Sequence, residues 1–245
     1  MKRIFKTSLL LAAASLLLAS CRLDGYDPSL LYPNAIVTVK TAEDGTCFLQ
    51  LTSDSAVKPV NLVKSPFGRE VRALVNITEK GASPDSRFDR LVEVNSIDSV
   101  RTKSAVPTRG EEDAAVYGAD PVEVIGYWVT GLEDGYLTLA FCAFWGDPVK
   151  KHSLDLVAGT DPEDPELYVL RHNALDDRGW PEQYRMTGTI AFDLRDEDGN
   201  WPQTLSLKYR SFDGERTLRF TSDRYAAEHP GAASLNGVNT TLPIE

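Results

Sequence analysis

Histidine side chains have the clearest potential for proton transfer, because the imidazole ring titrates near neutral pH. The 245-residue chain has three histidines. His152 and His172 fall on segments that chain order places on neighbouring strands of one domain, close to Asp155 and Asp176. A site that combines the two rings with one of these carboxylates is therefore one hypothesis for catalysis or metal binding.

A structural role for the same rings is the favoured alternative. His172 alternates onto the strand face that carries Tyr168 and Leu170, which is typical of a core histidine with a satisfied ring nitrogen. His229 lies in a stretch rich in Pro, Gly and Ala and is expected to be solvated. The chain lacks the Gly-x-Ser-x-Gly, His-Glu-x-x-His and phosphate-loop motifs. We therefore predict no catalytic residues, no cofactor and no enzymatic activity.

One acidic loop suggests a calcium site. An EF-hand loop that starts at Asp196 would need Gly and Glu where the chain has Trp201 and Leu207. A β-turn over residues 196–200 explains the same acidic and glycine residues, and a calcium site of another type is the alternative. No metal ligands are predicted.

Two cysteines, Cys47 and Cys142, lie within apolar strand patterns. Neither belongs to a Cys-x-x-Cys pair, which argues against zinc binding and thiol redox chemistry. We expect two separately buried thiols, and a disulfide formed in an oxidising compartment is the alternative.

Four tryptophans are candidates for ligand contact. Trp128 and Trp145 lie in or beside apolar strand patterns and are expected in the core. Trp180 and Trp201 lie in polar loops, and loops on a rigid scaffold often carry binding residues. We take Trp180 and Trp201 as candidate binding residues, with packing of these loops onto a sheet as the alternative.

The N-terminus has the features of a bacterial lipoprotein signal in the expected order. A basic segment (residues 1–6) precedes an apolar stretch (residues 7–18) that is too short to span a bilayer. Leu18-Ala19-Ser20-Cys21 then matches a lipobox, in which small residues precede a cysteine that receives diacylglycerol. We predict cleavage of residues 1–20 and lipidation of Cys21, and several acyl chains would anchor the protein stably in a membrane.

The charge balance limits the partners of the mature chain. Residues 1–20 hold three basic and no acidic side chains, which leaves 23 basic against 36 acidic residues and a formal charge of −13. Such a chain is repelled by nucleic acid and by anionic lipid headgroups. We therefore exclude nucleic acid as a partner and expect membrane contact only through the lipid anchor.

Strand patterns begin after a short extended tether (residues 21–33). In residues 34–101, five short β-branched or alternating segments are separated by turns, which favours a small barrel of the OB type. The predicted strands are residues 35–40, 46–52, 60–63, 71–77 and 91–100.

The apolar pattern stops over residues 102–117, where Pro107, Gly110 and several charged residues predict an exposed linker. Strand patterns resume in residues 118–225 and favour an antiparallel β-sandwich, followed by a C-terminal tail (residues 226–245). The predicted fold is all-β, a small OB-like barrel followed by an antiparallel β-sandwich. The predicted sandwich strands are residues 122–129, 136–145, 152–157, 167–172, 190–194, 205–209 and 218–220.

The order of these blocks is similar to that of the NigD-like lipoproteins of the Bacteroidota. Segments 136–139, 152–157, 170–174 and 191–194 resemble that family's C-terminal pattern. The resemblance covers nearly the whole mature chain and implies an OB domain plus a β-sandwich. It supplies no catalytic residues, because the family is named after a bacteriocin gene neighbourhood. The acidic run that often follows the lipidated cysteine is diluted here (residues 22–27), which weakens the case for transport to the outer face.

Three functions remain open. The first is a non-enzymatic binding or accessory lipoprotein of the outer membrane, facing the periplasm or the cell surface, with an envelope protein as partner. The second is an immunity-type protein that neutralises a bacteriocin, which is suggested only by the family name. The third is a glycan-binding module or a degenerate hydrolase. A neighbouring toxin gene would favour the second, and a polysaccharide-utilisation cluster would favour the third.

Overall fold

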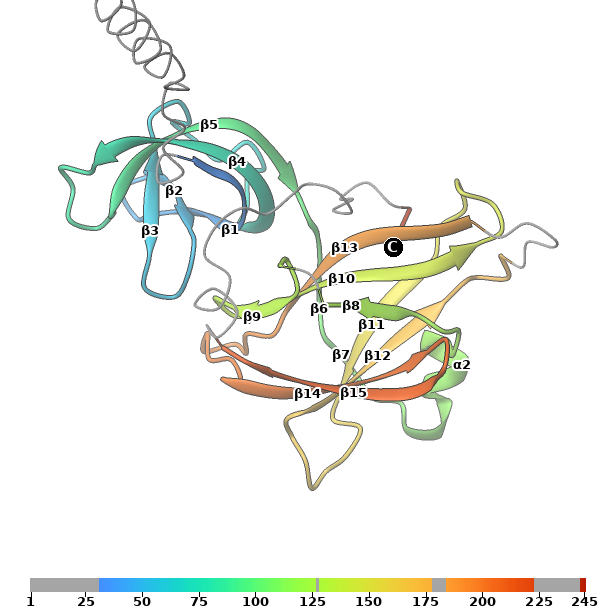
Figure 1. Cartoon of the computed structure of the whole chain (residues 1–245). Coiled ribbons are helices and arrows are strands. Elements are labelled where there is room, and N and C mark those ends of the chain that lie inside the picture. The colour runs from blue at the N-terminus through green and yellow to red at the C-terminus, as the bar shows by residue number, and fades with distance from the viewer. Residues whose placement is uncertain (1–30, 127, 178–183, 223–242) are drawn as a thin grey trace, which may run out of the picture. The chain divides into compact units, whose positions relative to one another are not determined.

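The computed structural model describes residues 31–126, 128–177, 184–222 and 243–245, and strands dominate these ranges (Figure 1). Their helices are short, η2 (Gly110–Glu112) and α2 (Asp113–Tyr117). None of the described helices is long and apolar enough to cross a membrane. Cys21, Trp180 and His229 lie outside the described residues.

The first five strands close into a barrel in the order β1-β2-β3-β5-β4 (Figure 1), which confirms the predicted small barrel. Alternate side chains of the strands point inward and are buried in the barrel core, because the side-chain period of a strand is two. The strands are β1 (Leu31–Thr41), β2 (Cys47–Gln50), β3 (Ala56–Pro59), β4 (Val71–Ala82) and β5 (Arg90–Ser99).

The third barrel strand was predicted at residues 60–63, and this position is wrong. The strand is β3 at residues 56–59, and Val63 is 82% exposed. Asn61 explains the early end of the strand, because its side chain takes over the pairing with β5. Its amide donates to the carbonyl oxygen of Val94 (2.8 Å), and its Oδ1 accepts from the Val94 N–H (2.9 Å).

The second half of the chain forms two sheets that pack face to face, which confirms the predicted β-sandwich. One sheet has the order β6-β13-β10-β8 with β9 also paired to β10, and the other has the order β15-β14-β12-β11-β7. Trp145 and Phe141 from one sheet and Leu154 from the other are fully buried in the shared core. The strands introduced here are β8 (Glu123–Ile125), β9 (Gly131–Glu133), β10 (Tyr136–Trp145), β11 (Ser153–Ala158), β12 (Leu167–Asn173), β13 (Tyr184–Asp193), β14 (Thr204–Ser211) and β15 (Gly214–Thr221).

The sheets are mixed rather than wholly antiparallel. β12 pairs in parallel with β14, β6 (Arg101–Ser104) with β13, and β7 (Val106–Pro107) with β11. The prediction of an exposed linker at residues 102–117 is therefore wrong, since β6 and β7 add one edge strand to each sheet. These strands are only a few residues long and lie at sheet edges, so they need no alternating apolar pattern that the sequence could reveal.

The end of the predicted C-terminal tail is also part of the sandwich. Ile244 forms a parallel bridge with His152 and is buried in the sandwich core. The His152 N–H donates to the carbonyl of Pro243 (3.0 Å), and the Glu245 N–H donates to the carbonyl of His152 (2.9 Å). Residues 243–245 are thus a short strap along the sheet that contains β11.

Replacement of Gly118 by alanine should destabilise the fold strongly. Gly118 follows α2 with φ +93, and a Cβ there would lie 2.3 Å from the carbonyl oxygen of His172 and 2.5 Å from Cβ of Asn173. Backbone strain and overlap together should cost about 2 to 5 kcal/mol of unfolding free energy in urea titrations. Gly199→Ala is the matched control, because Gly199 has φ +82 with open space around it. This control should lose only about 1 kcal/mol, and equal losses in the two variants would contradict the prediction.

Candidate functional site

The two predicted histidines meet in the core of the sandwich. His152 immediately precedes β11, and His172 lies on β12 opposite Leu154, so antiparallel pairing brings the rings together. Nδ1 of His152 lies 2.9 Å from Nε2 of His172. The outer nitrogens contact Oδ2 of Asp177 (3.2 Å from His152 Nε2) and the carbonyl oxygen of Pro121 (3.0 Å from His172 Nδ1). We refer to Asp177, His152, His172 and the Pro121 carbonyl as the histidine chain.

The carboxylate of the histidine chain is Asp177, and neither Asp155 nor Asp176 takes part in it. Asp155 binds Nζ of Lys103 (2.6 Å) and accepts from the Ser153 hydroxyl (2.5 Å). Asp176 is exposed and has φ +60. The sequence signal for Asp177 is weak: this tight turn, in which Leu175 also has positive φ (+49), directs the second of two adjacent aspartates back toward the core.

The histidine chain is closed to solvent. The exposed fractions of His152, His172 and Asp177 are 0, 2 and 6%. The ring of Trp145 stacks on that of His152 with centroids 4.2 Å apart and an interplanar angle of 8°. The ring nitrogens of both histidines thus contact protein atoms and are withdrawn from solvent. Among the described residues, no group of three or more His, Cys, Asp or Glu side chains is placed to hold a metal ion.

Burial also determines which members of the histidine chain ionise. It lowers the pKa of His172 to about 4, since the charged ring would lose its hydration. Burial lowers the pKa of His152 as well, although Asp177 opposes this effect. For Asp177, burial disfavours the carboxylate, but hydrogen bonds from Asp147, His152 and Gly146 hold its pKa below the usual value.

The predicted tryptophan contact sites are only partly described. Trp201 is half-buried and packs against the sandwich core, as the packing alternative expects. Trp180 falls outside the described residues, so its candidate binding role stays a prediction. Trp145 is fully buried, and Trp128 is partly buried in a smaller apolar cluster, as expected for both.

The acidic loop at residues 196–200 has the geometry of a turn. Oδ1 of Asp196 accepts from the N–H groups of Asp198 (3.0 Å) and Asn200 (2.8 Å), and Gly199 has φ +82. Cys47 and Cys142 are buried free thiols, which confirms the prediction of separate core cysteines.

One end of the sandwich carries exposed apolar side chains. Val149 (78% exposed) lies on the loop between β10 and β11, and Leu175 (44%) lies on the loop after β12. Tyr184 (49%) and Phe144 (38%) lie at the adjoining ends of β13 and β10, where Tyr184 is paired with Trp145. We call Phe144, Val149, Leu175 and Tyr184 the apolar end. Asp177 holds its two loops together by accepting from the N–H groups of Gly146 (2.7 Å) and Asp147 (3.1 Å).

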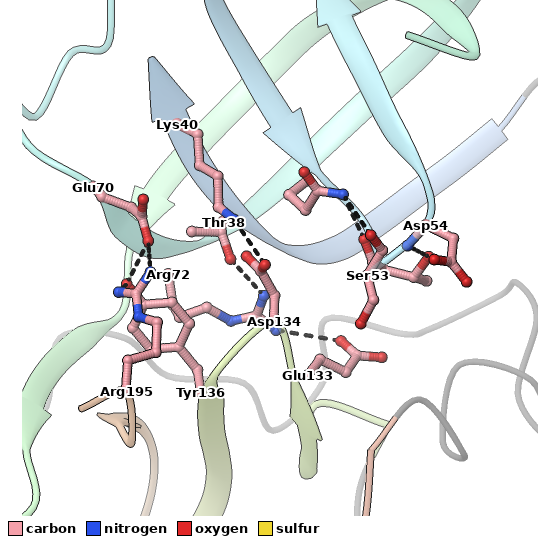
Figure 2. Close-up of polar contacts among 12 residues, drawn as sticks. Thr38, Lys40, Ser53, Asp54, Glu70, Arg72, Glu133, Asp134, Tyr136 and Arg195 are labelled. Carbon is pink, nitrogen blue, oxygen red and sulfur yellow. Dashed lines mark hydrogen bonds and ion pairs between the residues drawn. The ribbon is translucent and has the colours of Figure 1, made fainter. Parts of the chain in front are cut away.

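A second polar cluster joins the barrel to the sandwich (Figure 2). Arg72 on β4 is 1% exposed and donates to Oγ1 of Thr38 (3.0 Å) and to Oε2 of Glu133 on β9 (3.3 Å). Its guanidinium lies over the ring of Tyr136, 5.7 Å from the centroid, and Lys40 binds Asp134 at 2.7 Å. Burial lowers the pKa of Arg72, while Glu133 opposes that shift. We call these residues the junction cluster.

Further contacts extend the junction. The Tyr136 hydroxyl donates to Glu70 (2.9 Å), and Arg195 binds the same carboxylate (Figure 2). Arg195 also binds Tyr136 and Asp193. Burial raises the pKa of Tyr136, so its hydroxyl stays protonated as a donor. Apolar side chains of the barrel and the sandwich also share one cluster, and residues 32–245 form one compact unit. This cluster contains Ile36, Leu74, Val100, Val129, Ala140 and Ala191.

Comparisons with known proteins agree with this architecture. A model of the NigD-like C-terminal β-sandwich domain matches residues 104–222. A protein named as toxin-related from Parabacteroides distasonis is 29% identical, with a TM-score of 0.59, over 80% of this chain and 96% of that one. No curated protein is significantly similar in sequence.

Two further solved structures share the fold at lower identity. A protein of unknown function from Bacteroides vulgatus is 18% identical, with a TM-score of 0.66, over 83% of this chain and 97% of that one. A NigD-like immunity protein from Bacteroides caccae is 20% identical, with a TM-score of 0.50, over 81% of this chain and 94% of that one.

Proposed function

We propose that this chain, whose residues 104–222 match a model of the NigD-like C-terminal β-sandwich domain, is a NigD-like, non-enzymatic binding lipoprotein of the cell envelope. Lipid on Cys21 anchors it in the outer membrane, and the barrel and sandwich together hold a protein partner there. The lipobox at Leu18-Ala19-Ser20-Cys21 supports the anchor.

The sealed histidine chain is the observation that carries the non-enzymatic part of the proposal. General acid–base catalysis requires a side chain within hydrogen-bond reach of the substrate. His152 and His172 instead contact each other, Asp177 and a backbone carbonyl, and almost none of their surface is exposed. The ring nitrogens that could have served catalysis therefore form hydrogen bonds within the core.

The apolar end is the surface that we propose for the partner. Four of the seven large hydrophobic side chains that are exposed in the described part of the chain lie there; the others are Val60, Val63 and Val116. Trp180, a predicted binding residue, lies between Leu175 and Tyr184 in the sequence. Exposed apolar and aromatic side chains grouped on one surface are typical of protein interfaces. The net negative charge of the mature chain favours a neutral or basic partner.

A double substitution at the apolar end tests this proposal. Val149→Asp with Leu175→Asp places two charges on exposed positions, so the fold should remain intact while the apolar contact is lost. We expect a partner crosslinked in native envelopes by the wild-type protein to be reduced at least about tenfold with the variant, which corresponds to about 1.4 kcal/mol. Val63→Asp, an equally exposed change on the barrel, is the control. Undiminished recovery with the double variant would show that the partner binds elsewhere.

An immunity role is the second candidate. It is supported by the names of two similar structures, one toxin-related and one a NigD-like immunity protein, although the latter shares only the fold at 20% identity. Expression of this protein should then protect a sensitive strain from a bacteriocin encoded nearby. Equal killing with and without the protein would remove this candidate.

A further inference from the structure

The histidine chain needs more protons than two neutral histidines can supply. It contains three close polar contacts: Asp177 to His152, His152 to His172, and His172 to the Pro121 carbonyl. Each contact needs one proton to be a hydrogen bond. A carboxylate and a carbonyl can only accept, and each neutral imidazole carries one N–H. Two neutral rings therefore satisfy two contacts, and the third requires one additional proton.

An added proton on either ring would satisfy all three contacts, and the geometry places it on His152, which contacts the Asp177 carboxylate directly, whereas His172 faces a neutral carbonyl. Nδ1 of His172 must donate to the carbonyl of Pro121, so a neutral His172 offers a lone pair at Nε2. Nδ1 of His152 must then donate to this lone pair, and only a doubly protonated His152 can also donate to Asp177. The carboxylate supplies the counter-charge, and the stacked indole of Trp145 is a favourable neighbour for a cation.

We propose that His152 is a proton-dependent switch: with its second proton it ties Asp177 to the core, and without that proton the tie is lost. As long as His172 donates to the Pro121 carbonyl, loss of the proton leaves the lone pair of Nε2 of His152 facing a carboxylate oxygen at 3.2 Å, which is repulsive. Asp177 also holds the N–H groups of Gly146 and Asp147, so the switch controls how firmly the β10–β11 loop is fixed. This switch does not depend on whether the apolar end binds a partner.

The direction of the pH dependence follows from the groups around His152. Burial lowers its pKa from 6.5, and the neighbouring charge of Lys150 acts the same way, while Asp177 and Asp120 raise it. Of the neighbouring groups, His172 is neutral, and Glu245 on the strap is engaged by Lys151. A ring that keeps its burial but loses Asp177 binds the proton less well. Proton binding and the Asp177 contact therefore favour each other, and the tie tightens on the acid side of pH 6.5.

Ring nitrogen NMR of the full protein in mild detergent tests the switch directly. With labelled histidine, we expect both nitrogens of His152 to show imidazolium shifts at about pH 5 and a neutral ring at about pH 8. His172 should remain a neutral ring with its proton on Nδ1 at both values. A neutral His152 at the lower pH, with no change between the two, would overturn the proposal without any variant.

Asp177→Asn separates the switch from a merely structural role. An amide nitrogen in place of Oδ2 can donate to Nε2 of a neutral His152, so the three contacts of the histidine chain are satisfied without an added proton. The amide oxygen in place of Oδ1 still accepts from the Asp147 N–H, while Gly146 loses its acceptor. In the wild type, corrected protection of the Gly146 and Asp147 amides against exchange should rise about tenfold from pH 8 to pH 5. Asp177→Asn should abolish this change, and Asp176→Asn, at the exposed neighbouring carboxylate, should retain it. The same pH dependence in Asp177→Asn would overturn the proposal.

Discussion

Cys21→Ala should move the protein completely from the membrane fraction to the soluble fraction. The lipobox at residues 18–21 predicts lipid on Cys21, and the apolar stretch at residues 7–18 is too short to span a bilayer. The acyl chains on Cys21 are therefore the proposed membrane attachment. Metabolic labelling with a palmitate analogue and fractionation of the envelope measure the two consequences of the change.

Cys47→Ala serves as the control for this experiment. Cys47 is a buried thiol in the barrel core, and its loss removes a cysteine without touching the lipobox. This variant should keep both the label and the membrane association. Undiminished label in Cys21→Ala would contradict the lipoprotein assignment.

Arg72→Ala should lower the free energy of unfolding by roughly 3 to 5 kcal/mol, which is the range for removing one partner of a buried ion pair. Arg72 is 1% exposed, and it bonds Thr38 within the barrel and Glu133 of the sandwich. Its loss leaves a largely buried cavity beside Tyr136 and withdraws the counter-charge from Glu133. Urea titration of the wild type and the variant measures the loss.

Lys80→Ala is the matched control for Arg72→Ala. Lys80 and its partner Glu93 form an ion pair in which each side chain is 43% exposed. Water and salt screen such a pair, so this variant should lose less than about 1 kcal/mol. A loss from Arg72→Ala as small as that of Lys80→Ala would show that the junction cluster contributes little to stability.

The barrel and the main sandwich strands could be predicted because the residue pattern within each strand is enough to identify it. Alternating apolar residues, as in Val71, Ala73, Val75 and Ile77, determine which strand face is buried without knowledge of its partners. The same reasoning fails for β6, β7 and the strap at residues 243–245. Each is short and is held mainly by backbone pairing with distant residues, which leaves little trace in side-chain pattern.

The polar sites show a similar limit. The sequence pattern placed His152 and His172 on neighbouring strands, and the structure brings the rings into contact. It missed Asp177, because a tight turn with positive φ at Leu175 and Asp176 sets the direction of that carboxylate. Arg72 occupies a polar position in an alternating strand and therefore looks solvent-exposed in sequence. Only the packing of the sandwich against β4 buries it.

The central claim is that this protein works by holding a partner at the apolar end, and site-specific photocrosslinking in intact cells tests it most directly. A photoreactive residue at Val149 should give a discrete protein adduct, and the same residue at the exposed barrel position Val63 should give none. The adduct should be lost when Leu175→Asp is added. An adduct from Val63 but not from Val149 would contradict the account.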